Sequence, residues 1–101
     1  MNHTEPQIAH MADAIRKISE ARHYHRYFGA PVGGLSERHN KLRADANATR
    51  VRVLSFEAGR AAFLSGGCFD DFEASLDIDE IRDSFMAGWM DTVGPLAKFV
   101  R

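Results

Sequence analysis

Apolar residues recur every three or four positions in three stretches of the chain, which is the spacing of one face of an α-helix. The first stretch consists of Ile8, Met11, Ile15, Ile18 and Ala21. Thr4 and Gln7 stand where a capping box would begin it, and Gly29 and Pro31 follow its end. The pattern predicts a helix over about residues 5–28 with one apolar face that must pack against another element.

A second stretch follows the Gly-rich turn and begins after Ser36, a good N-cap residue. Its apolar positions fall near a heptad spacing: Leu42, Ala46, Thr49, Val53, Phe56 and Phe63. One long helix over residues 36–65 is therefore an option, although Asn47, Thr49 and nearby β-branched residues favour a weak point near 47–50.

The third stretch predicts a helix whose apolar face is Ile78, Ile81, Phe85, Trp89 and Val93. Gly94 and Pro95 are predicted to end it. No stretch alternates with the period of a β-strand, so the predicted fold class is all-α. We expect a long N-terminal helix packed on a C-terminal helical hairpin, with residues 1–101 forming a single small helical domain.

Small residues mark the predicted hairpin. Gly59, Ala62 and Gly66 recur at three and four residues, on the side of a helix where a second backbone can approach closely. Phe85 and Trp89 are four residues apart and share one face of the next helix. We expect Trp89 to cover the small face around Gly59, with Gly88 leaving room beside the indole.

These residues resemble the ribosome modulation factor family of small bacterial hibernation proteins. The positions that carry the resemblance are Gly59, Ala62, Gly66, Cys68, Phe85, Gly88 and Trp89, all within residues 52–91. No proline follows Cys68, and the connector after it is longer and more acidic than in that family's pattern. The resemblance implies a non-enzymatic protein that binds ribosomal RNA or the ribosome.

Charge is unevenly divided along the chain, although the net charge is only −1. Residues 1–55 carry nine Lys or Arg against five acids, and residues 56–101 carry four against nine. Such polarity is compatible with pairing of the two halves, with a head-to-tail homodimer, or with two separate binding surfaces. It is also what solvated helix faces alone would produce.

The basic half is the candidate RNA-binding surface. Its candidate residues are Arg22, Arg26, Lys41, Arg43, Arg50 and Arg52, and histidines and tyrosines lie among the first of them at residues 22–28. Cations bind phosphates, and aromatic rings stack with bases. Helix-dipole compensation and solvation are the alternative explanation of these charges. We expect no metal site from His23, His25 and His39, because residues two apart point to different sides of a helix and no further ligand accompanies them.

The connector after Gly67 places seven acids within residues 70–83. Their order does not match a calcium-binding loop. The alternative function to RNA binding is a small regulator or inhibitor, of the kind that phages also encode. It would engage a basic protein surface with Asp70, Asp71 and Glu73. A solvated loop would need no partner.

Composition excludes several other classes. A single cysteine leaves no intramolecular disulfide, and no apolar run reaches the length of a membrane span. The N-terminal residues lack the pattern of a secretory signal, so we expect a cytoplasmic protein. A bacterial origin is what the family resemblance implies, and a phage origin belongs to the regulator alternative. No catalytic triad, metal motif or phosphate-binding loop is present in the sequence, and we expect neither enzymatic activity nor a cofactor.

Overall fold

The computed structural model describes residues 4–26 and 31–97, with only the backbone given for residues 95–97. The elements in chain order are helix α1 (Glu5–Arg26), helix α2 (Glu37–Leu64), the short 3-10 helices η1 (Phe69–Asp71) and η2 (Glu73–Ser75), and helix α3 (Asp79–Ala97). Over the described residues there is no strand, so the predicted all-α class is confirmed. The predicted end of the first helix at residues 27–28 lies outside the described residues.

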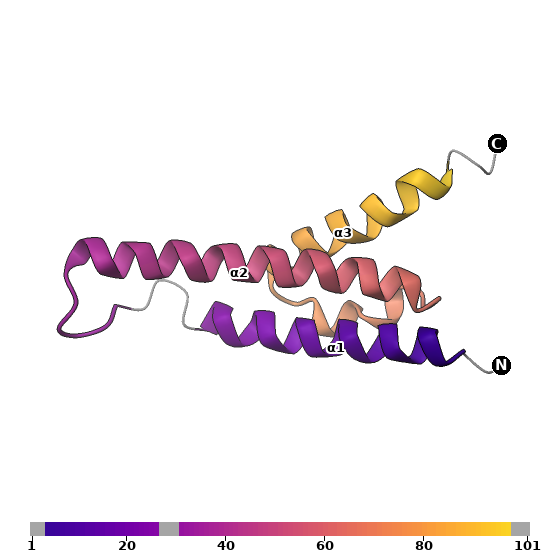
Figure 1. The fold of residues 1–101 in the computed structure, drawn as a ribbon, viewed down its shortest axis with the longest axis horizontal. Coiled ribbons are helices and arrows are strands. Elements are labelled where there is room, and N and C mark those ends of the chain that lie inside the picture. Colours follow the sequence, from indigo (N-terminus) through magenta and orange to yellow (C-terminus); the bar gives the residue numbers. More distant parts are fainter. Residues whose placement is uncertain (1–3, 27–30, 98–101) are drawn as a thin grey trace.

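Helices α1 and α2 run antiparallel, side by side, and α3 packs on α2 at an angle, with its C-terminal half pointing away from α1 (Figure 1). Both predicted caps form. The Thr4 N–H donates to the Gln7 side chain (2.9 Å) and the Gln7 N–H donates to the Thr4 hydroxyl (3.3 Å). The Ser36 hydroxyl accepts from the His39 N–H (3.2 Å). These bonds satisfy N–H groups that lack partners in the first turn of each helix.

Helix α2 is continuous through residues 47–50, where the residue types favour a weak point. The Thr49 hydroxyl donates to the Asp45 carbonyl oxygen (3.0 Å), so this polar residue is accommodated within the helix. The helix ends at Leu64, and Gly66 follows its C-cap residue Ser65 with a φ of 76°, a left-handed conformation that glycine adopts without steric cost. Gly66 therefore terminates α2, which differs from the predicted role in helix contact.

Two glycines set the crossing of α2 and α3. A methyl group added at Gly59 would lie 2.0 Å from the Phe85 carbonyl oxygen, and one added at Gly88 would lie 1.9 Å from the Phe56 carbonyl oxygen. Each glycine thus lies against the backbone of the other helix. The predicted close approach at Gly59 is correct, and the atoms nearest to both glycines are backbone atoms, of Phe85 and Trp89 at Gly59 and of Phe56 at Gly88.

The Trp89 ring instead packs edge-on against Phe63 (centroids 5.4 Å apart) and Phe69 (6.0 Å), and it stays partly exposed. The fully buried aromatic of α3 is Phe85. This arrangement follows from the backbone contact at the two glycines, which leaves no space for an indole between the helices.

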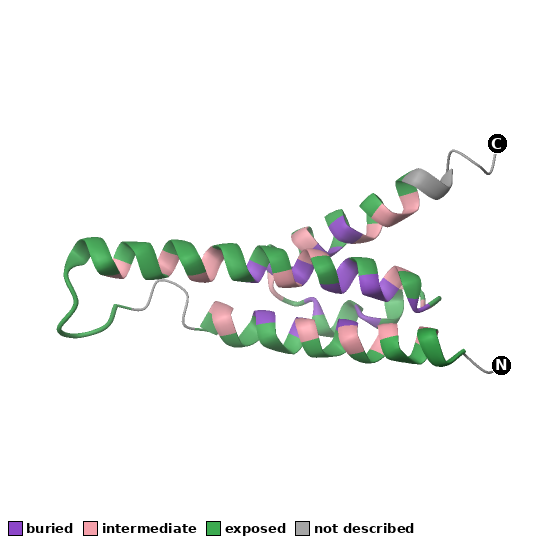
Figure 2. Ribbon diagram, in the orientation of Figure 1, coloured by how far each residue is buried: buried purple, intermediate pink, exposed green. Residues whose placement is uncertain are grey.

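Buried residues line the facing sides of the helices (Figure 2). On α1 they are Ala14, Ile18 and Ala21, and on α2 they include Val51, Ala58, Ala61 and Ala62. Two residues of the predicted α1 stripe, Ile8 and Ile15, are 57% and 56% exposed, which corrects that prediction. Small alanines allow the two axes to lie close together, so the face with Ala14, Ile18 and Ala21 turns inward, while Ile8 and Ile15 remain outside.

The connector is anchored by buried Phe72 and Leu76. Helix α3 then continues through Gly94 and Pro95 to Ala97, so the prediction that this pair ends the helix is wrong. A proline removes one backbone donor, and so close to the helix end few later bonds depend on it. None of the helices described in the structure combines the length and the apolar character needed to cross a membrane.

Candidate nucleic-acid interface

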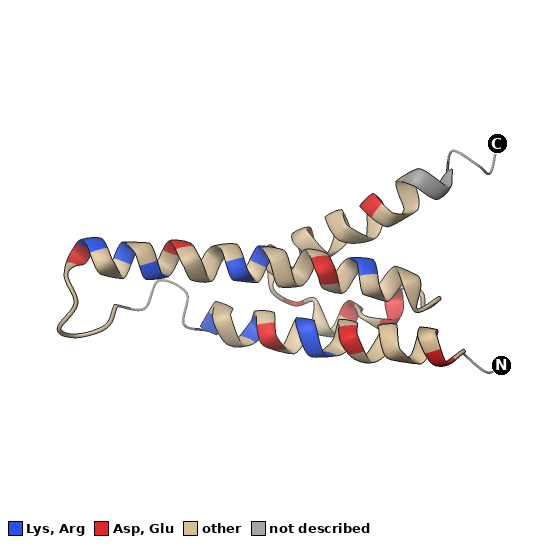
Figure 3. Ribbon diagram, in the orientation of Figure 1, with Lys and Arg blue, Asp and Glu red and all other residues tan. Residues whose placement is uncertain are grey.

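The antiparallel arrangement places the C-terminal end of α1 beside the N-terminal half of α2, and Lys and Arg residues of both helices gather there (Figure 3). Among the described residues, the predicted cations Arg26, Lys41, Arg43, Arg50 and Arg52 have no carboxylate within ion-pair distance. Their charge is therefore available to an anionic partner.

A polar hollow of about 350 Å³ lies between the two helices at this end. Its lining residues are His23 and Tyr24 of α1 and Arg43, Ala46, Asn47 and Arg50 of α2, and we call it the Tyr24 hollow. The Arg50 guanidinium carbon lies 5.1 Å from the centre of the Tyr24 ring, within the range of a cation–π contact. The His23 ring meets the Tyr24 ring edge-on, with centroids 5.6 Å apart. The hollow thus combines two cations with two aromatic rings in edge-on contact.

Arg22 does not belong to this hollow. Its guanidinium pairs with the Asp77 carboxylate and donates to the Ser75 carbonyl oxygen (3.3 Å), which ties α1 to the connector. The hydrogen bond from Arg22 holds the pKa of Asp77 below its usual value of 3.8. The sequence assigned Arg22 to RNA binding, whereas its charge is already matched within the chain.

The remaining candidate cations are divided between two sides of α2. Arg43 and Arg50 are seven residues apart and lie on nearly the same side of the helix. Arg52 is two residues after Arg50 and therefore lies on a different side. Arg52 faces α3, and its guanidinium donates to the Thr49 hydroxyl (3.3 Å). Arg26 and Lys41 are exposed at the same end of the molecule as the Tyr24 hollow, but neither of them lines the hollow. The structure therefore brings two of the six predicted RNA-binding residues into one site.

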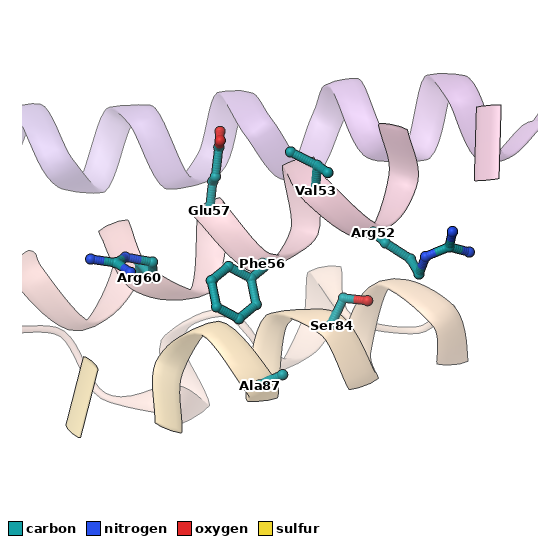
Figure 4. Close-up of a pocket in the computed structure, with 7 residues that line it drawn as sticks. All are labelled: Arg52, Val53, Phe56, Glu57, Arg60, Ser84 and Ala87. Atoms are coloured by element: carbon teal, nitrogen blue, oxygen red, sulfur yellow. The ribbon is translucent and has the colours of Figure 1, made fainter. Parts of the chain in front are cut away.

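A second, largely apolar groove of about 580 Å³ lies between α2 and α3 (Figure 4). Phe56 of α2 turns toward Ala87 and Ser84 of α3, and the side chains of Arg52 and Arg60 extend at either end. Arg60 pairs with Asp91 of α3 (2.9 Å). The charge of Arg60 is therefore matched within the chain.

The candidate acids of the connector are exposed but have local partners. The Asp71 carboxylate accepts from the Cys68 N–H (2.9 Å), and Glu73 lies 3.9 Å from Arg82. Asp70 is exposed on η1 and has no ion-pair partner among the residues described. Two of the three acids proposed for protein binding thus also stabilise the connector itself.

Four of the residues that carry the family resemblance lie at or near the crossing of α2 and α3. Gly59, Ala62, Phe85 and Gly88 are buried at or near the α2–α3 crossing, Trp89 is partly buried, Gly66 ends α2, and Cys68 is exposed before η1. None of them lines the Tyr24 hollow. The motif therefore shapes the hairpin, and the candidate interface lies elsewhere on α2.

Asn47 is the hollow residue that sequence reasoning missed, because its residue type indicates only a weak helix former. The signal was the spacing of Arg43, Asn47 and Arg50, which are four and three residues apart and so share one side of α2. Only the structure places Tyr24 opposite them.

Comparison with protein-family models, with curated proteins and with solved structures gives no match.

Proposed function

We propose that the protein binds RNA through the Tyr24 hollow and the cations around it. The observation that carries the proposal is the meeting of Arg43 and Arg50, neither of which has a carboxylate partner in the described part of the chain, with the rings of Tyr24 and His23. Cations neutralise phosphates, and aromatic or guanidinium planes stack with unpaired bases. This combination suits single-stranded RNA better than a protein surface, which offers fewer planar groups.

The resemblance to the ribosome modulation factor family supports ribosomal RNA as the target. The residues that carry the resemblance build the α2–α3 hairpin, and α2 also presents Arg43 and Arg50. A rigid hairpin would hold the hollow in a fixed orientation when part of the protein contacts a ribosome.

Co-sedimentation with bacterial ribosomes and a mobility shift with single-stranded RNA test the proposal. Replacing Arg26, Arg43 and Arg50 with Glu should weaken both by at least about tenfold at low salt, because attraction to phosphate becomes repulsion. Arg22 is left unchanged, since its loss would break the contact with Asp77. A wild-type protein that neither sediments with ribosomes nor shifts RNA at low salt would overturn the proposal.

A matched control reverses the charge of two arginines that lie outside the hollow. Arg16 and Arg82 lie outside the hollow, beside Asp13 (2.5 Å) and Glu73 (3.9 Å) respectively. Replacing both with Glu should leave RNA binding within about twofold, because their charges are already matched. Circular dichroism of each variant verifies that the helices are intact.

A second candidate is the regulator that engages a basic protein surface with Asp70, Asp71 and Glu73. The exposure of all three side chains on one short segment favours it. Changing them to Asn and Gln keeps hydrogen-bond acceptors, including the one that bonds to Cys68. This triple variant separates the two candidates, because it removes negative charge without touching the cations of the hollow.

A further inference from the structure

Asn47 lies between the two arginines of the Tyr24 hollow. The spacing of four and three residues puts the amide on the same side of α2 as Arg43 and Arg50, and the two arginine Cα atoms are about 10 Å apart along the helix. The Asn47 side chain is half-buried, and none of the hydrogen bonds within the described residues involves its amide. An amide that offers both a donor and an acceptor therefore lies unpaired at a site bordered by cations.

The opposite wall supplies a flat surface. Tyr24 comes from α1, and the Arg50 guanidinium lies over its ring, so that a planar ligand can stack on the guanidinium or on the free part of the ring. The volume of about 350 Å³ is in the range of small-ligand sites. The hollow thus has room for one base, a stacking plane, an amide for its edge and a cation on either side for the phosphates.

We propose that the Tyr24 hollow binds one unpaired adenine of an RNA strand, with the Asn47 amide reading its N6 and N7 atoms. The Asn47 oxygen accepts from the N6 amino group, and the Asn47 nitrogen donates to N7. Adenine is the base whose N7 edge presents one acceptor and one donor, which an amide matches with two bonds. Guanine presents two acceptors there, which an amide cannot satisfy with two bonds. Arg43 contacts a flanking phosphate. This inference rests on the proposed RNA-binding function and names the base that the site selects.

Fluorescence anisotropy with three short RNA probes tests the inference. The probes are an oligouridine, the same strand with one central adenosine, and the same strand with 7-deazaadenosine, which lacks the N7 acceptor. Wild type should bind the adenosine strand about tenfold more tightly than the other two. Asn47→Ala should abolish this difference between the adenosine strand and the other two. Thr49→Ala, on the other side of α2 and outside the hollow, should retain the preference.

The outcomes separate the inference from the function on which it rests. If all three strands bind equally to wild type, or if Asn47→Ala keeps the preference for adenosine, RNA binding stands and adenine recognition by Asn47 is overturned. If a different base is preferred when it is placed at the centre of the same strand, the inference is likewise overturned. If none of the strands binds at low salt, the proposed function fails, and the inference fails with it.

Discussion

At the scale of single residues, backbone contact decides the packing of α2 on α3. Gly59 and Gly88 occupy reciprocal positions, each against a carbonyl oxygen of the opposite helix. Glycine is normally unfavourable within a helix by about 1 kcal/mol relative to alanine. At these two positions the close approach of the helices, with burial of Phe85 beside it, offsets that cost.

Replacing either glycine with alanine should therefore destabilise the protein. The added methyl group would lie about 2 Å from a backbone oxygen, and the helices must move apart to admit it. We expect Gly59→Ala and Gly88→Ala each to lower the free energy of unfolding by about 1–3 kcal/mol in urea denaturation, despite the better helix propensity of alanine. Gly33→Ala is the control, because nothing lies within 4 Å of its added methyl group. A stabilisation by Gly88→Ala would show that the helices do not cross where we place them.

At the scale of elements, ion pairs connect α1 to the rest of the chain. Lys17 lies 3.2 Å from Asp13 and 3.0 Å from Glu57 of α2, while Arg22 pairs with Asp77 of the connector. The pKa of Asp77 lies below 3.8 because of its hydrogen bond with Arg22, and the pKa of Asp13 is lowered chiefly by its hydrogen bond with Arg16. Both carboxylates are thus more acidic in the folded chain than in the unfolded chain.

This difference gives the contact a defined pH dependence. A carboxyl whose pKa is depressed on folding contributes stability above its unfolded value, near 3.8, and loses it as the pH falls through the folded value. Thermal denaturation of wild type should show a falling Tm between about pH 5 and about pH 2. Asp77→Asn should have a lower Tm than wild type at neutral pH, and the two should converge at the acidic end. A constant gap between the two proteins over this range would contradict the Arg22–Asp77 contact.

Helices and caps could be predicted from the sequence because they depend on local signals. The Thr4–Gln7 box and the Ser36 cap form as their residue types indicate. The inward face of α1 could not be predicted from periodicity alone, since Ile8 and Ile15 have the same spacing as buried residues. Which face turns inward depends on how closely α2 approaches, and alanines on both helices set that distance.

The candidate site was predictable only in part for the same reason. Composition identified Arg43 and Arg50 as cations, but their meeting with Tyr24 depends on the antiparallel pairing of α1 and α2. Arg22 carries the same charge as Arg43 and Arg50, but it pairs with Asp77 of the connector. Partners that come from distant parts of the chain decide which charges remain available.

At the scale of the whole molecule, basic and acidic surfaces lie at different places. Unpaired cations gather where α1 ends beside α2, and the acids of η1 and η2 follow the far end of α2 (Figure 3). The molecule is elongated, 54 Å along its longest axis. Acids after η2 nevertheless reach the C-terminal half of α1, where Asp77 pairs with Arg22 and Glu80 lies 3.3 Å from His25.

Neutralising the connector distinguishes the two candidate functions. The variant with Asp70→Asn, Asp71→Asn and Glu73→Gln should bind single-stranded RNA as well as wild type does or slightly better, because negative charge is removed. Its Tm should fall by only a few degrees, since the amide oxygen introduced by Asp71→Asn still accepts from the Cys68 N–H. Loss of ribosome binding by this variant with an unchanged Tm would favour the protein-binding regulator.

The salt dependence of RNA binding tests the central claim, that Arg43 and Arg50 contact phosphates, most directly. Each contact with a single strand contributes about 0.7 to the slope of log K against log salt concentration. Wild type should therefore give a slope of at least about 1.4 in magnitude, and a variant with Arg43→Gln and Arg50→Gln should be shallower by about that amount. A double variant with Arg16→Gln and Arg82→Gln, which loses the same formal charge, should keep the wild-type slope. Equal slopes for wild type and the Arg43/Arg50 variant would contradict the account.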